Sequence, residues 1–337
     1  TLDRIETLVD SGAREADPKA RVRAYVTANF ELHARILRGE DAPIAILSDI
    51  RAMKPPLRTE LLDRYLLIFR KLRGYFGLPA DDRQRALTTA RAHALLQNMF
   101  WLIAWLPEYG AEDFDRARDR LLEIFEHGFA PSGARWAPDA LPVPRTTGHS
   151  QGMPGHYLRT ATELINERGY RGASVEDIVA QLNVTKGSFY HHHDAKDDLV
   201  VDCFKQSHLR TSLVQQAGFE APGDSLHRIN SVIATLLDVQ FAGDFPLLRS
   251  TALQALPDEW RIDVFEQSGR VARRFAGMLI DGISEGVIRP IDPLIASQVI
   301  MATLNAAYDL RKWASGMPGE EAVALYATTL TQGLFAD

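Results

Sequence analysis

Apolar residues recur at three- and four-residue spacings along most of the chain, and this period restricts the fold more than any other feature. Between Arg21 and Ile36 the apolar positions fall on one face of a helix. The period returns between Leu57 and Phe76, and residues 88–106 are apolar nearly all round, as expected of a helix buried between others. The alternating pattern of strands is absent from the sequence. The chain is therefore predicted to be all-α.

Composition excludes several classes of protein. The chain has 337 residues, enough for two or three domains, and 46% of them are hydrophobic, which is ordinary for a soluble protein with a core. No stretch reaches the roughly 18 apolar residues of a membrane span, so no membrane partner is expected. The single cysteine, Cys203, cannot form an internal disulfide, and a cytoplasmic location is expected. The net charge of −6 argues against a protein that coats nucleic acid, although a small DNA-reading module on an acidic body remains compatible with it.

A stretch rich in proline and glycine divides the chain at residues 131–153. Proline removes backbone donors and glycine loosens the chain, so this stretch is predicted to be a linker. Before it, residues 1–130 form one predicted helical domain. After it, we expect a small domain at 154–200 and a second large helical domain at 201–337.

The two large segments resemble each other. Residues 44–76 and 246–279 both contain an apolar helix, a break at proline, and then a long helix with a basic pair. Residues 120–129 likewise resemble residues 325–335. The shared order favours an internal duplication, and the general likeness of amphipathic helices is the alternative explanation.

Residues 154–200 carry the signals of three short helices separated by tight turns. Gly169 is placed to end the first helix in the left-handed conformation. Ser174 and Asp177 have the spacing of a capping box at the start of the second helix. Asn183 suits a tight turn, and Thr185 is placed to cap a short third helix. This order is typical of a helix-turn-helix, whose recognition helix enters the major groove of DNA.

The third helix is expected to turn Phe189 inward and its polar side chains outward. The glycine in it removes a side chain where the backbone must approach something closely. The residues expected to contact DNA are Ser174, Thr185, Lys186, Gly187, Ser188, Tyr190, His191 and Lys196. Of these, Lys186, Tyr190 and Lys196 are expected on phosphate, and Thr185, Ser188 or His191 on base edges. Five basic and seven acidic residues lie in 154–200, which predicts modest affinity with a strong salt dependence.

The same residues resemble the DNA-binding domain of the tetracycline-repressor (TetR) family. The resemblance is carried by Gly169–Tyr170, Ser174–Val175, Ile178, the run from Val184 to His191, and Lys196 to Leu199. The family usually has phenylalanine after the histidine, and here His192 or His193 must take its core position. The resemblance implies that residues 201–337 bind an effector and dimerise through two C-terminal helices. It also implies that residues 1–130 are a second such domain, and a first helix-turn-helix is expected before Thr1.

An effector pocket would need aromatic and polar residues on the helices of these domains. Asn305 and Asp309, four residues apart on an otherwise apolar helix, form a buried polar pair for which a ligand could be the partner. A core or seam position is the alternative for each aromatic residue. The candidate pocket residues are Trp101, Trp105 and Tyr109 in the first half and Trp260, Asn305, Tyr308 and Asp309 in the second.

No enzyme, metal or cofactor is predicted. The sequence contains no phosphate loop, nucleophile triad or dinucleotide motif, and the adjacent histidines at 191–193 point about 100° apart on a helix, so they cannot converge on one ion. We expect a ligand-responsive regulator, a repressor that binds double-stranded operator DNA and is released by a small apolar or aromatic effector. The alternative is a helical sensor or interaction protein with weak or lost DNA binding. The two helical domains are expected to pair within the chain as a pseudo-dimer, with a homodimer still possible.

Overall fold

The computed structural model describes residues 1–43, 49–143, 153–191, 193, 195–242 and 245–336, and within these ranges the chain is helical and contains no strand. The prediction of an all-α protein is confirmed. The α-helices are α1 (Leu2–Ala13), α2 (Pro18–Leu37), α3 (Asp49–Ala52), α4 (Leu57–Arg73), α5 (Asp82–Trp105), α6 (Phe114–His127), α7 (Met153–Arg168), α8 (Val175–Gln181), α9 (Lys186–Tyr190), α10 (Lys196–Glu220), α11 (Ser225–Ala242), α12 (Asp258–Glu285), α13 (Pro293–Ala306), α14 (Arg311–Ala314) and α15 (Gly319–Thr331).

Helix ends follow local side-chain chemistry. Asp17 and Asp81 each accept a hydrogen bond from the first turn of the helix that follows, α2 and α5 respectively. Asp292 does the same for α13, whose first residue is a proline that needs no hydrogen-bond partner. At the other end of α12, Gly286 takes the left-handed conformation, with φ of 77°. These caps determine where the long helices begin and end.

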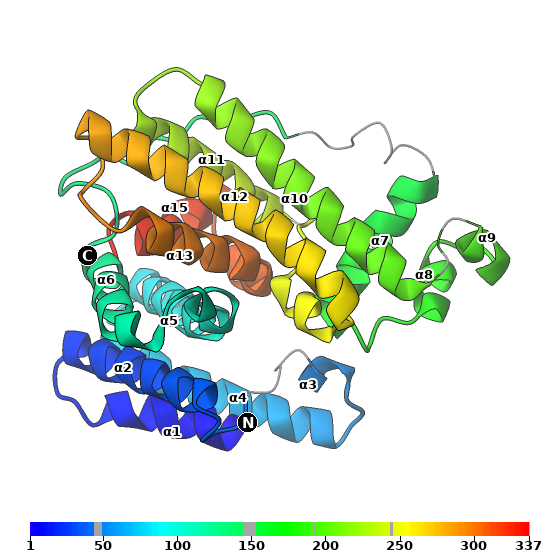
Figure 1. Ribbon diagram of the computed structural model, residues 1–337, viewed down its shortest axis with the longest axis horizontal. Coiled ribbons are helices and arrows are strands. Elements are labelled where there is room, and N and C mark those ends of the chain that lie inside the picture. Colours follow the sequence, from blue (N-terminus) through cyan, green and yellow to red (C-terminus); the bar gives the residue numbers. More distant parts are fainter. Residues whose placement is uncertain (44–48, 144–152, 192, 194, 243–244, 337) are drawn as a thin grey trace.

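The helices form two groups that pack alike. In the first group α1 contacts α2 and α4, α4 contacts α5, and α2 contacts α6. In the second group α10 contacts α11 and α12, α12 contacts α13, and α11 contacts α15. The first group lies along the lower side of Figure 1 and the second along the upper side, while α7, α8 and α9 lie together at one end.

The two groups meet along a seam of four helices. Both α5 and α6 contact both α13 and α15. Leu95 of α5, Ile300 of α13 and Tyr326 of α15 are fully buried and belong to one hydrophobic core that extends through both groups. The two halves of the chain therefore share apolar surface rather than touching at a few points.

The described part of the proline-rich segment lies against α11. The amide of Asp139 donates to Oγ of Ser231 at 2.9 Å, and the amide of Leu141 donates to Oγ1 of Thr235 at 3.2 Å. Trp136 is half-buried against the large core. Side-chain acceptors and one aromatic anchor thus hold this segment to the second group of helices.

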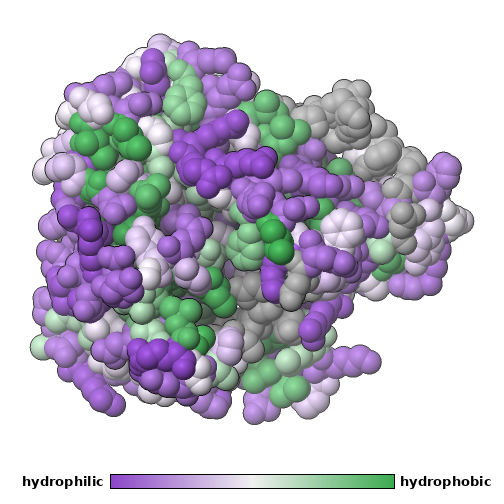
Figure 2. Space-filling view, viewed as in Figure 1, coloured by the Kyte–Doolittle hydropathy of each residue, from purple (hydrophilic) through white to green (hydrophobic). Residues whose placement is uncertain are grey.

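The surface is mostly hydrophilic on the face shown in Figure 2, with apolar residues in scattered patches. Among the described residues, no helix is long and apolar enough to span a bilayer.

Candidate functional site

A small hydrophobic core, which extends into residues 248–264, supports the three helices at the end of the molecule. Tyr157 of α7, Ile178 of α8 and Phe189 of α9 are fully buried together. Leu199 and Phe204 of α10 belong to the same cluster. The three-helix head therefore rests on α10, the long helix that leads into the second group.

The predicted turn and cap residues of the head are found in their expected conformations. Gly169 follows α7 with φ of 77° and Asn183 follows α8 with φ of 54°. Ser174 and Asp177 exchange the two hydrogen bonds of a capping box, and Oγ1 of Thr185 accepts from the amide of Ser188 at 3.2 Å. Two turns and two caps thus fix the angle at which α9 leaves α8.

One face of α9 is turned towards solvent. Thr185, Lys186, Gly187 and His191 are exposed, and Tyr190 has 55% of its surface exposed. A Cβ atom added to Gly187 would meet nothing closer than Oγ1 of Thr185 at 3.7 Å, so the protein itself does not require a glycine there. The missing side chain instead clears space on the outer face, where another molecule could approach the backbone.

Three of the residues expected on DNA also hold the head together. The hydroxyl and amide of Ser174 are both engaged with Asp177, and Ser188 is half-buried with its Oγ accepting from the hydroxyl of Tyr157 at 3.0 Å. Lys196 donates to the carbonyl of Tyr170, and its Nζ lies 4.0 Å from the centre of that ring. Burial lowers the pKa of Lys196. Its place in the structure is a support for the turn after α7.

Lys186 makes an ion pair with Glu176 across α8 and α9. The hydrogen bond to Glu176 raises the pKa of Lys186, so the ammonium group remains charged. Both side chains are more than half exposed, so the pair is weak and water competes for it. A phosphate could replace the carboxylate with little cost.

His193 fills the core position where the family usually has phenylalanine. Its side chain is 8% exposed and packs against the rings of Tyr157 and Phe189 at centroid distances of 6.0 and 5.7 Å. His192 lies outside the described residues. Of the two histidines considered from the sequence, the structure places His193 in the core of the head.

A buried three-helix head with one exposed recognition face defines a helix-turn-helix DNA-binding protein. Residues 158–203 match the model of the family described as bacterial regulatory proteins, tetR family. Residues 158–203 are therefore a DNA-binding domain of the TetR type, and the chain is similar to transcriptional regulators of that family.

Curated relatives of the chain are regulators. It is 27% identical over 159 residues to the HTH-type transcriptional repressor DhaR of Mycobacterium sp. (strain GP1), which covers 45% of this chain and 78% of that protein. It is 38% identical over 71 residues to the HTH-type transcriptional repressor Rv3405c of Mycobacterium tuberculosis, covering 21% of this chain and 37% of that protein. Among solved structures, the ketosteroid transcriptional regulator KstR2 of M. tuberculosis matches 56% of this chain and 96% of its own, with 18% identity and a TM-score of 0.46.

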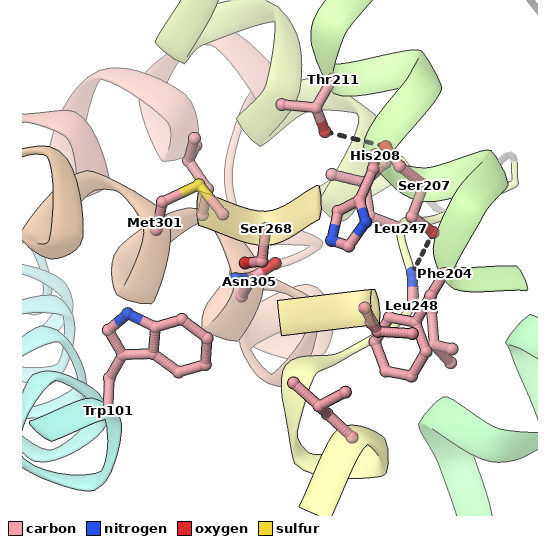
Figure 3. A pocket seen from close by; sticks show the side chains of 13 residues that line it. Trp101, Phe204, Ser207, His208, Thr211, Leu247, Leu248, Ser268, Met301 and Asn305 are labelled. Atoms are coloured by element: carbon pink, nitrogen blue, oxygen red, sulfur yellow. Dashed lines mark hydrogen bonds between the residues drawn. The ribbon is translucent and has the colours of Figure 1, made fainter. Parts of the chain in front are cut away.

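A cavity lies between α10, α12 and α13 and is closed on one side by α5. The space between its atoms, including the mouth that opens to solvent, is about 490 Å³. Two predicted pocket residues, Trp101 and Asn305, face it from different halves of the chain (Figure 3). The lining residues are Trp101, Phe204, Ser207, His208, Thr211, Leu247, Leu248, Leu253, Val264, Ser268, Met301, Leu304 and Asn305.

The other five predicted pocket residues do not line this cavity. Trp105 packs edge-on against Phe30 and Tyr109, as a core residue does. Trp260 is half-buried against the core of the DNA-binding head. The ring of Tyr308 lies 3.8 Å beneath the guanidinium of Arg311. Helical spacing alone could not separate these core positions from a pocket wall.

The idea that a ligand supplies the partner of Asp309 is corrected by the structure. Its two carboxylate oxygens accept hydrogen bonds from Arg51 at 2.7 Å and from Arg249 at 2.5 Å. Burial raises the pKa of Asp309, but the charges of Arg249 and Arg51 outweigh burial and hold it below its usual value. The buried acid is therefore satisfied within the protein, whereas no hydrogen bond to its neighbour Asn305 occurs within the described chain.

Arg51 and Arg249 belong to a hydrogen-bond network that links the cavity wall to α7 of the head. Arg51 also donates to the carbonyl of Asn166 in α7 at 2.7 Å. The side chain of Asn166 in turn holds the backbone of Leu247 and Arg249 at 2.9 Å each. This network could not be predicted from the sequence, because its members lie on segments far apart in the chain and no local pattern joins them.

Proposed function

We propose that the chain is a ligand-responsive repressor that binds double-stranded operator DNA through α9 and acts by binding rather than catalysis, in the cytoplasm. The observation that carries this proposal is the exposed face of α9 on a helix-turn-helix whose second and third helices are capped and whose core is buried. Lys186 would exchange Glu176 for a phosphate. Tyr190 and His191 are exposed beyond it and are the side chains best placed for phosphate or base edges.

We also propose that residues 1–130 and 201–337 are duplicated helical domains that pair inside one chain, as two subunits of a dimer would. Reciprocal backbone hydrogen bonds support this. The amide of Phe129, one residue after Gly128, donates to the carbonyl of Leu330, and the amide of Leu334, one residue after Gly333, donates to the carbonyl of Phe125. Phe125 and Leu330 each lie three residues before the glycine of their own half. Exchange of the same contact in both directions is the mark of a two-fold interface.

A contact near the expected two-fold axis supports the same proposal. Asn98 and Thr303 each lie thirty residues before the glycine of their half, so they are equivalent positions. The amide of Asn98 donates to Oγ1 of Thr303 at 3.4 Å. Equivalent residues touch each other only where a two-fold axis passes between them.

An effector would act through the wall of the cavity. Leu247 and Leu248 line the cavity, and the side chain of Asn166 in α7 is hydrogen-bonded to the backbone of the residues on either side of Leu248. A ligand that moved this wall would pull on α7 and reorient α9. Release from DNA therefore follows from a ligand that fits the cavity better in the displaced state.

Fluorescence anisotropy with a duplex selected from random DNA tests the DNA-binding part. We expect binding that weakens steeply with salt and that falls at least about tenfold in the double variant Lys186→Gln, Tyr190→Ala. Lys205→Gln is the matched control, because Lys205 is an exposed lysine of α10 that pairs with Asp202 and lies outside the recognition helix. Failure to select any duplex at low salt would contradict the proposal.

The second candidate function is a helical sensor that no longer binds DNA. It is favoured by the engagement of both lysines of the head, Lys186 with Glu176 and Lys196 with Tyr170. The same selection decides between the two functions, since a sensor without DNA binding would enrich no sequence at any salt concentration.

A further inference from the structure

We propose that the cavity takes a small uncharged molecule with an apolar body and a hydrogen-bonding head, and that both halves of the chain bind it. This inference rests on the proposed function, in which the cavity is the effector site.

Three polar groups in the cavity have no hydrogen bond within the described chain. Nδ1 of His208 is buried without a partner. Ser268, which is 8% exposed, and Asn305 make no side-chain hydrogen bond to any described residue. In Figure 3 the side chains of Ser268 and Asn305 lie together, and the ring of His208 lies beside them. An unsatisfied buried polar group such as Nδ1 of His208 destabilises a protein, so a ligand head that bonds to it and to the neighbouring Ser268 and Asn305 would bind favourably.

The head that these groups recognise is uncharged. Among the described residues, no lysine, arginine, aspartate or glutamate lines the cavity. The nearby charges of Arg249 and Asp309 are already paired with each other. Burial lowers the pKa of His208 to about 4, although a side-chain hydrogen bond with Gln267 acts in the opposite direction. This histidine is therefore neutral at pH 7. A carboxylate or ammonium group would be buried without a counter-charge, which is strongly unfavourable.

The two walls of the cavity that would contact the apolar body of the ligand come from different halves of the chain. Met301 and Leu304 of α13 belong to the second half, and Trp101 of α5 belongs to the first. Nε1 of Trp101 donates to Gln298 at 3.0 Å, which fixes the indole across the seam. A ligand between these walls would contact both halves at once and stabilise their pairing.

The equivalent place in the first half is built differently. The residue that corresponds to Asn305, counted from the glycine at the end of each half, is Phe100, and the residue that corresponds to Trp101 is Ala306. The side-chain amide of Asn305 therefore has no counterpart in the first half, and the indole of Trp101 has no counterpart in the second half. We infer one ligand per chain rather than two.

Isothermal titration of the full chain at pH 7.5 with four probes of equal length tests this. We expect hexanamide and 1-hexanol to bind at one molecule per chain, and hexanoate and hexylammonium to bind at least about tenfold more weakly. Hexanoate binding as tight as hexanamide, two molecules per chain, or no binding of hexanamide would each overturn the proposal.

Two pairs of variants locate the binding site. Asn305→Leu keeps the number and branching of the side-chain heavy atoms and removes the amide, so hexanamide should bind at least about tenfold more weakly. Trp101→Phe should also weaken it, whereas Trp105→Phe, one turn further along the same helix but outside the cavity, should leave the affinity unchanged. Equal effects of Trp101→Phe and Trp105→Phe would contradict a contribution from the first half. Thermal unfolding of each variant shows which of them are folded, and Ser268→Ala provides a second test of the head contact.

The failure of this inference is distinct from the failure of the proposed function. A chain that binds its selected duplex but none of the four probes retains DNA binding and loses the ligand class. Hexanamide binding that leaves the DNA affinity unchanged retains the cavity as a binding site and contradicts its role as an effector site.

Discussion

His93 is a buried histidine in the seam between the two halves. It is 4% exposed, and its Nδ1 shares a hydrogen bond of 2.8 Å with the hydroxyl of Tyr326 in α15. Burial lowers the pKa of His93 to about 4, so the ring is neutral under ordinary conditions. The contact between α5 and α15 therefore depends on a group that resists protonation.

Acid should destabilise the seam through this residue. The pKa of histidine is about 6.5 in the unfolded chain and about 4 in the folded one, so the unfolded state binds the proton more readily between these values. Stability is then lost as the pH falls below 6.5, by about 2 kcal/mol from this residue at pH 5. Urea unfolding at pH 7 and pH 5 should show a smaller loss for His93→Gln than for the wild type. Equal losses in the two proteins would contradict this assignment.

Glu176 is the residue that competes with DNA for Lys186. Replacing it by glutamine leaves the capping box of Ser174 and Asp177 in place and frees the lysine. We expect Glu176→Gln to bind the selected duplex about threefold to fivefold more tightly, because an exposed ion pair is a weak competitor. Lys186→Gln should reduce the slope of log affinity against log salt by about one, since one phosphate contact is lost. A slope unchanged in Lys186→Gln would show that Lys186 does not reach phosphate.

At the scale of elements, the short helix α3 connects the first half to the DNA-binding head. It contacts both α4 and α7, and its Arg51 bonds to Asn166 of α7 and to Asp309. The first half thus reaches the head directly, without passing through α10. A change in the seam could therefore reach α7 both through α3 and through α10.

Arg51→Met should loosen the end of α7. The loss of two charge-assisted hydrogen bonds predicts a decrease in the free energy of unfolding of about 1–3 kcal/mol. Hydrogen exchange of the amides in residues 163–168 should accelerate more than exchange in α12. Arg38→Met is the control, because Arg38 pairs only locally with Glu40. Uniform acceleration across the chain would indicate general destabilisation instead of a local link.

Sequence patterns predicted the elements better than the connections between them. Capping residues such as Ser174 and Thr185 act within one turn of the chain, so their spacing was sufficient to place α8 and α9. The cavity was predicted only in part, with Trp101 and Asn305 found and His208 and Ser268 missed. A single small polar residue on an amphipathic helix carries no sign of which neighbour it faces. That information arises only from packing between distant segments.

At the scale of the whole molecule, the described structure has one DNA-binding head, and its two halves already pair along the four-helix seam. A seam that is already occupied by α5 and α6 leaves α13 and α15 no free face of the same kind for a second chain. The proposed pseudo-dimer therefore predicts a monomer of 37.6 kDa in light scattering at low concentration. A mass of twice that value would show that chains also pair with each other.

The reciprocal glycines provide the sharpest test of the seam. Gly128 has φ of 64°, and a Cβ atom added to it would lie 2.3 Å from the carbonyl oxygen of Thr331 in the other half. Gly133 also has a positive φ, of 78°, and an added Cβ atom would meet nothing within 4 Å, so Gly133→Ala measures the cost of a positive φ without a clash. We expect Gly133→Ala to cost about 1 kcal/mol and Gly128→Ala about 2–4 kcal/mol in urea unfolding, because overpacking adds about 1–3 kcal/mol to the strain. Gly333→Ala, with φ of 85° and the carbonyl oxygen of Phe125 at 2.7 Å, should behave like Gly128→Ala. Equal costs for Gly128→Ala and Gly133→Ala would mean that the two halves do not meet at this point in solution.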